Sequence, residues 1–124
     1  MVTVSNDTIV EDSLSEFINS NEVVQTYRFF VYGLPNEEEI SLLARGLFFQ
    51  FEKLPVKGEA IVTAEEIDEN KAVAFNLFRG AVLTFAFATK EDMEDMVKGI
   101  ILDGLDYLRY KVDYLGAKEV ESNV

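Results

Sequence analysis

Residues 58–67 read GEAIVTAEEI, residues 71–78 read KAVAFNLF and residues 81–88 read AVLTFAFA. Each segment is short and rich in apolar residues, and an Asp-Glu-Asn or Arg-Gly group separates it from the next. Such punctuation is typical of strands joined by tight turns. The pattern therefore predicts an antiparallel three-stranded meander over residues 58–88.

A long helix is expected directly after the third strand. Thr89 is a suitable N-cap, and Asp92 lies three residues further on, as in a capping box. Apolar residues then recur at helical spacing as far as Leu115, and Gly116 is a typical residue to follow a helix C-terminus. These signals predict a helix over residues 90–115 that packs on the sheet.

Alternation divides the side chains of the three strands by size. One face is expected to carry the large residues Ile61, Val73, Phe75, Leu77, Leu83, Phe85 and Phe87. The other is expected to carry Ala60, Val62, Ala64, Ala72, Ala74, Asn76, Val82, Thr84, Ala86 and Ala88. The second face is not polar, as a solvated sheet face usually is, so a helix or a second chain should cover it. The candidate contact of a homodimer comprises Ala72, Ala74, Ala86 and Ala88.

Two helices and one strand are expected before the meander. Apolar spacing predicts a helix over residues 8–19, and a β-branched and aromatic run predicts a strand over residues 23–32. Asn36 and Glu39 form a capping box for the next helix. Its apolar stripe comprises Ile40, Leu43, Ala44, Leu47, Phe48 and Phe51. Three glycines are expected inside helices and to mark close approach of another backbone; they are Gly46, Gly99 and Gly104.

The expected fold class is α+β, in the order α-β-α-β-β-β-α, with a mostly antiparallel four-stranded sheet and helices packed on it. By its length the chain, residues 1–124, is expected to form one domain. Residues 7–116 are expected to be ordered, between flexible tails at 1–6 and 117–124. The expected core includes Phe75, Phe85 and Leu105.

The amino-acid composition excludes several kinds of catalytic and metal-binding site. The chain has no Cys and no His, which excludes disulfides, thiolate and imidazole metal sites, and nucleophiles activated by histidine. No GxGxxG or GxxxxGK[ST] motif is present to cradle a phosphate. We therefore expect no catalytic residue, no cofactor and no metal site. No apolar run reaches the roughly 20 residues of a membrane span, and a secretory signal is not expected, so a cytoplasmic location is predicted.

The net charge of −12 arises from 23 acidic and 11 basic residues. Such a balance repels phosphate backbones and anionic membranes, and it attracts basic protein surfaces. Direct nucleic-acid and membrane binding are therefore not expected, whereas a partner protein with a basic surface is. The candidate partner-binding residues are Glu91, Glu94, Asp95, Asp103, Asp106 and Asp113. Arg28 and Arg79 lie on or beside apolar strands, where each would either bind an anionic ligand or pair with a carboxylate.

Four classes of function are compatible with these features. The first is a non-catalytic acidic protein-binding module: an inhibitor, an immunity-type protein or an adaptor, with mimicry of nucleic-acid charge as a special case. The second is a structural or assembly subunit that uses the apolar sheet face. The third is a small-ligand-binding domain with an aromatic pocket. The fourth, an enzyme using carboxylates and tyrosines, has the least support, and the first is the prediction carried forward.

Overall fold

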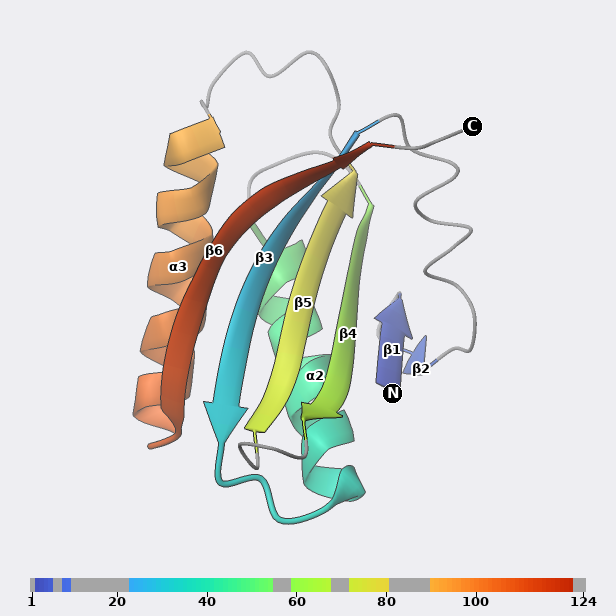
Figure 1. Cartoon of the computed structure of the whole chain (residues 1–124), viewed down its shortest axis with the longest axis vertical. Helices are drawn as coiled ribbons and strands as arrows, with labels where there is room; N and C mark the ends of the chain where they lie inside the picture. Colours follow the sequence, from blue (N-terminus) through green and yellow to red (C-terminus); the bar gives the residue numbers. More distant parts are fainter. Residues whose placement is uncertain are drawn as a thin grey trace.

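Six strands form one antiparallel sheet, and two helices lie on one side of it, in the part of the chain that the computed structural model describes (Figure 1). The described residues are 2–5, 8–9, 23–54, 59–67, 72–80 and 90–121. The strands are β1 (Val2–Ser5), β2 (Thr8–Ile9), β3 (Val23–Tyr32), β4 (Ala60–Ile67), β5 (Ala72–Gly80) and β6 (Lys111–Glu121). The helices are α2 (Glu37–Glu52) and α3 (Lys90–Tyr107). The predicted α+β class and antiparallel pairing are confirmed.

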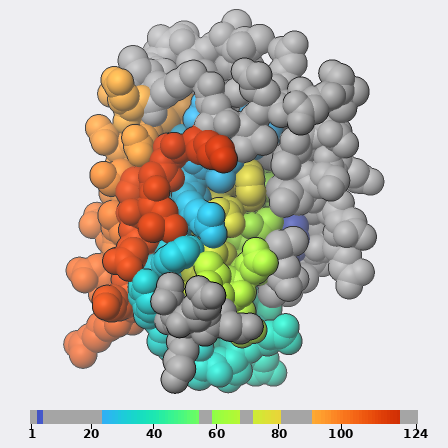
Figure 2. Space-filling model, viewed as in Figure 1, coloured from blue at the N-terminus to red at the C-terminus, as the bar shows by residue number. Residues whose placement is uncertain are grey.

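The strand order across the sheet is β2-β1-β4-β5-β3-β6. From β3 onward the chain runs β-α-β-β-α-β, the order of the ferredoxin-like, or split β-α-β, arrangement. The β1–β2 pair extends the sheet beyond β4. In Figure 1 the sheet lies in front of α2, and α3 runs beside β6. Figure 2, seen from the same direction, therefore looks onto the face of the sheet that carries neither helix.

The observed order differs from the predicted α-β-α-β-β-β-α, and the sheet has more than the four strands expected. Thr8–Ile9 form β2 where a helix over residues 8–19 was predicted. Residues 10–22 and the predicted strand 81–88 lie outside the described residues. Val2–Ser5, expected in a flexible tail, pair with β4 as β1.

The helix predicted over residues 90–115 ends at Tyr107. Arg109 has a φ of 64°, and the Tyr110 amide donates to the Leu105 carbonyl while the Arg109 amide donates to the Asp106 carbonyl. These bonds are those of a Schellman motif, in which a left-handed residue stops the helix. The chain then returns as β6, so residues 117–121, expected in a flexible tail, pair with β3.

The register of β4 against β5 corrects the predicted division of the sheet faces. Val62 lies opposite Leu77 and Ala64 opposite Phe75, so the small residues of β4 share the helix-covered face with the large residues of β5. Ile61 points to the opposite face. A register offset of one residue exchanges the two faces of a strand. Because residues 60–64 are buried on both faces, their pattern could not decide which face is which.

The beginning of α2 and the centre of the core agree with the predictions. The Asn36 Oδ1 atom accepts a hydrogen bond of 2.9 Å from the Glu39 amide, and the predicted apolar stripe of α2 is buried. Phe75 and Leu105 are fully buried, whereas Phe85 lies outside the described residues. The prediction that the helical glycines mark close approach of another backbone is wrong for the described structure. A Cβ atom added at Gly46, Gly99 or Gly104 would have no neighbour within 4 Å beyond the local chain.

Candidate functional site

One side of α3 carries a row of exposed carboxylates. This side of the helix lies opposite the side that carries the buried residues Met93, Val97, Ile101 and Leu105. Four of the predicted partner-binding residues lie there, together with Asp92; the acidic face of α3 comprises Glu91, Asp92, Asp95, Asp103 and Asp106. These carboxylates lie on one surface because of their spacing along the helix. The helix itself is shorter than predicted and ends at Tyr107 rather than at residue 115.

Glu94 and Asp113, the other two predicted partner-binding residues, have partners inside the chain. The Tyr114 hydroxyl donates to Glu94 Oε2 at 2.6 Å and joins β6 to α3. The Tyr32 hydroxyl donates to Asp113 Oδ2 at 2.8 Å and joins β3 to β6. Burial and the bond to Glu94 raise the pKa of Tyr114, and the bond to Asp113 raises the pKa of Tyr32. Both hydroxyls therefore remain protonated donors at neutral pH.

Three large apolar side chains are exposed near the C-terminal end of α3. Ile100, Tyr107 and Leu108 are 38%, 86% and 54% exposed. Ile100 and Tyr107 lie seven residues apart on α3, close to Asp103 and Asp106 in sequence, and Leu108 follows the helix directly. Tyrosine is among the residue types that supply much of the binding energy at protein interfaces. The acidic face of α3 therefore has an apolar border.

Arg79, expected to bind an anionic ligand or to pair with a carboxylate, lies in the core and is 2% exposed. It donates through Nη2 to the carbonyl oxygen of Phe51, and its guanidinium carbon lies 4.6 Å from the centroid of the Phe51 ring. Burial lowers the pKa of the Arg79 guanidinium, while the charge interactions with Tyr27 and Glu52 favour its charged form. Arg79 thus joins β5 to the end of α2 through Phe51.

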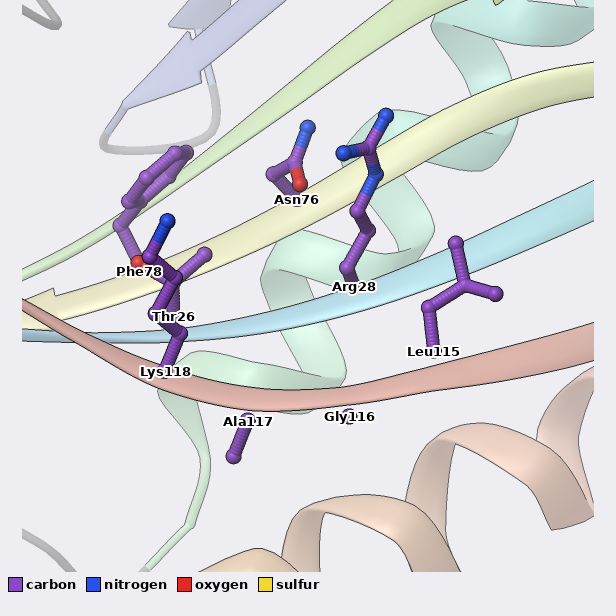
Figure 3. A pocket seen from close by; sticks show the side chains of 8 residues that line it. All are labelled: Thr26, Arg28, Asn76, Phe78, Leu115, Gly116, Ala117 and Lys118. Carbon is purple, nitrogen blue, oxygen red and sulfur yellow. The ribbon is translucent and has the colours of Figure 1, made fainter.

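The helix-free face of the sheet contains a hollow of about 520 Å³ (Figure 3). Two cross-strand rows from β5, β3 and β6 build it: Phe78, Thr26 and Lys118 in one, Asn76, Arg28 and Gly116 in the other. Leu115 and Ala117 complete the lining. We call it the sheet-face pocket. Among its residues the sequence singled out only Arg28 as a ligand-binding candidate, because the pairing of β3 with β6 was not predicted.

The sequence also assigned four alanines to a homodimer contact. Ala72 and Ala74 are 2% and 0% exposed in the single chain, so a second chain has little of their surface to cover. Ala86 and Ala88 lie outside the described residues.

Within residues that the structure describes, no group of three or more Asp or Glu side chains is placed to hold a metal ion. In the same part of the chain, neither helix is long and apolar enough to cross a bilayer. No protein-family model matches the chain, and neither a curated protein nor a solved structure is significantly similar to it.

Proposed function

We propose that the protein is a non-catalytic binding module that engages a basic protein surface through the acidic face of α3. The observation that supports this function is the placement of five exposed carboxylates along one side of α3, beside the exposed ring of Tyr107. Like charges on one face attract a basic partner over distances set by the ionic strength, and the apolar border adds short-range contact. An inhibitor, an immunity-type protein or an adaptor would each use such a surface.

Two variants with the same net charge test the location of the binding surface. The first carries Asp95→Asn, Asp103→Asn and Asp106→Asn on α3. The second carries Glu52→Gln, Glu65→Gln and Glu66→Gln, whose side chains are also exposed but lie on α2 and β4.

A cell extract is passed at low salt over each immobilised protein, and the affinity of every retained protein is then measured with purified components. A partner that binds through the acidic face of α3 binds the parent protein and the second variant but has lower affinity for the first variant. Its affinity for the parent protein should also fall as the salt concentration rises. A partner whose affinity falls equally for both variants responds to net charge alone. If no purified partner distinguishes the two variants, the acidic face of α3 is not the binding surface.

Self-association as a homodimer and a cytoplasmic location belong to the same proposal. The net charge of −12 opposes association of two copies, but salt screens that repulsion over about 8 Å at physiological ionic strength. Sedimentation equilibrium at micromolar concentration decides the oligomeric state, and a single species of monomer mass would remove the dimer from the proposal.

A further inference from the structure

The sheet-face pocket has the opposite charge from the protein as a whole. Among the described residues that line it two are basic, Arg28 and Lys118, and none is acidic, although acidic residues outnumber basic ones by 23 to 11 in the chain. Arg28 and Lys118 are both exposed, and within the described residues neither forms an ion pair. Among the described residues, the pocket lining therefore offers two positive charges that no carboxylate contacts directly.

Strand register brings these two charges to neighbouring positions. Arg28 lies opposite Gly116, and Lys118, two residues further along β6, lies opposite Thr26. Arg28 and Lys118 are thus diagonal neighbours on one face, a relationship that places two residues about 7–8 Å apart, with their Cβ atoms somewhat closer. An anion between them would make charge-assisted hydrogen bonds to both and relieve their mutual repulsion.

A β-bulge gives the pocket its depth. The register between β3 and β6 shifts between Arg28 and Phe29, which leaves Leu115 as an extra residue on β6. Bulges of this kind bend a strand and redirect its side chains. Gly116 follows with a φ of 109°, and because it has no side chain, nothing fills the space opposite Arg28 (Figure 3).

The floor of the pocket contains a buried polar atom that lacks a partner. Thr26 is 8% exposed, and its Oγ1 atom makes no hydrogen bond within the described structure. A buried hydroxyl without a partner is unfavourable. The Oγ1 atom is shielded from solvent in the free protein, so the Thr26 side chain must shift before a ligand can bond to it, and that bond would displace no internal one. Asn76 beside Arg28 supplies a further amide group.

The remaining walls are apolar. Phe78 stands in the row of Thr26 and Lys118, and Leu115 is 48% exposed on the β6 side of Arg28 (Figure 3). The guanidinium of Arg28 itself lies 5.3 Å from the centroid of the Phe30 ring, which restricts where it can point. A volume of about 520 Å³ falls within the usual range of small-molecule sites.

We propose that the sheet-face pocket binds a small molecule that carries one anionic group on a planar apolar body. The anionic group lies between Arg28 and Lys118, and the body packs on Phe78 and Leu115. Carboxylates on the same face, Glu65 of β4 and Asp113 of β6, lie outside the lining and disfavour an extended polyanion such as nucleic acid. The site is separate from the acidic face of α3, so either binding activity can exist without the other.

Three naphthalene compounds distinguish the contributions of charge and of the apolar body. Naphthoate carries a carboxylate, naphthyl phosphate carries a phosphate, and naphthalenemethanol is neutral. Each is titrated into the full chain while backbone amide NMR signals are followed. We expect the two anions to shift the signals of Thr26, Arg28 and Gly116 saturably, at one site per chain, and the stronger of them identifies the headgroup. The neutral compound should bind at least tenfold more weakly, in keeping with the loss of charge-assisted hydrogen bonds.

Matched variants locate the site. Arg28→Gln and Lys118→Gln should each weaken binding of the better anion about tenfold or more, by loss of one charged contact. Arg45→Gln removes an equal charge from the exposed surface of α2 and should leave binding unchanged. Circular dichroism and the unfolding midpoint show whether each variant remains folded.

Three results would overturn the proposal: no saturable shift with either anion, equal affinity for the neutral compound, or equal loss of affinity in Arg28→Gln and Arg45→Gln. A single-stranded oligonucleotide that binds this face more tightly than both anions, and loses affinity in Arg28→Gln, would also replace the small molecule as the occupant.

Discussion

The guanidinium of Arg79 donates to the carbonyl oxygen of Phe51 and lies over the ring of the same residue, 4.6 Å from its centroid. The last turn of α2 contains no basic residue, but Lys53 follows it as the C-cap, so Arg79 of β5 adds a second positive charge at a helix C-terminus, where positive charge is favourable. One residue thus fixes the end of α2 against the sheet.

Arg79→Ala should therefore lower the free energy of unfolding by about 2–4 kcal/mol, because it removes a charged hydrogen bond and leaves a cavity in the core. Arg45→Ala, at an exposed position in the middle of α2, should change it by no more than about 1 kcal/mol. Urea unfolding followed by circular dichroism measures both values. Equal effects would show that Arg79 does not support α2.

Two glycines with different backbone conformations should respond in opposite directions to alanine. Gly99 lies inside α3 with open space at its Cβ position, so Gly99→Ala should stabilise the protein by about 0.5–1 kcal/mol. Gly116 has a φ of 109°, so Gly116→Ala should destabilise it by about 1–2 kcal/mol. Thermal unfolding compares the two. A destabilising Gly99→Ala would indicate that another chain approaches α3 at this position.

Arg109 stops α3 in a conformation that L-residues seldom adopt, with a φ of 64°. Arg109→Gly should stabilise the protein by about 0.5–1 kcal/mol, because glycine adopts the left-handed conformation without steric cost. The same substitution in the middle of α2, Arg45→Gly, should instead destabilise it by about 1 kcal/mol. Chemical denaturation measures both, and a loss of stability in Arg109→Gly would show that its side chain makes a contact that outweighs the backbone strain.

Alkaline pH should weaken the fold through Tyr27. Burial raises the pKa of Tyr27 from 10.0 to about 12. Below pH 10 both folded and unfolded chains keep this proton, so the stabilisation is fully present. Between about pH 10 and 12 the unfolded chain releases the proton while the folded chain holds it, so the free energy of unfolding falls by about 1.4 kcal/mol per pH unit.

The measurement is urea unfolding at neutral pH and across that window. Tyr27→Phe removes this titration and should give a shallower decline than the parent protein. Tyr107→Phe is the control, since the Tyr107 ring is 86% exposed, and it should retain the slope of the parent. If Tyr27→Phe and Tyr107→Phe decline alike, the loss of stability comes from other groups.

A helix or strand could be predicted from the sequence where the residues that begin it, end it and form its apolar face all lie within the segment itself. The start of α2 needed only Asn36, Glu39 and one apolar stripe, all within the segment itself. β6 was missed because Val112 and Leu115 fit the helical period as well as a strand, and because the residue that stops α3 is Arg109, whose type gives no stop signal. Gly116, which does resemble a helix stop, instead forms part of a bulge.

The sheet-face pocket could not be predicted for a related reason. Its rows exist only when β3 lies between β5 and β6, and that pairing joins segments far apart in sequence. The position of four of the six candidate partner-binding residues on one surface of α3 follows from helical spacing alone, whereas their role as a binding surface stays a prediction. The spacing of residues along the chain therefore predicts which side chains share a helix surface. It does not predict a pocket that forms only when three separate strands pair.

The position of β3 between β5 and β6 also affects how the chain can be made. Phe29 of β3 pairs with Phe75 on one side and Tyr114 on the other, and both residues follow it in sequence. During synthesis the apolar row of Tyr27, Phe29 and Val31 is therefore complete before either neighbouring strand exists. Such a strand can associate with other nascent chains until its partners arrive. Protection of β3 on its β6 side depends on a strand that begins 79 residues after the end of β3, so a ribosome that stalls before Lys111 leaves that edge open.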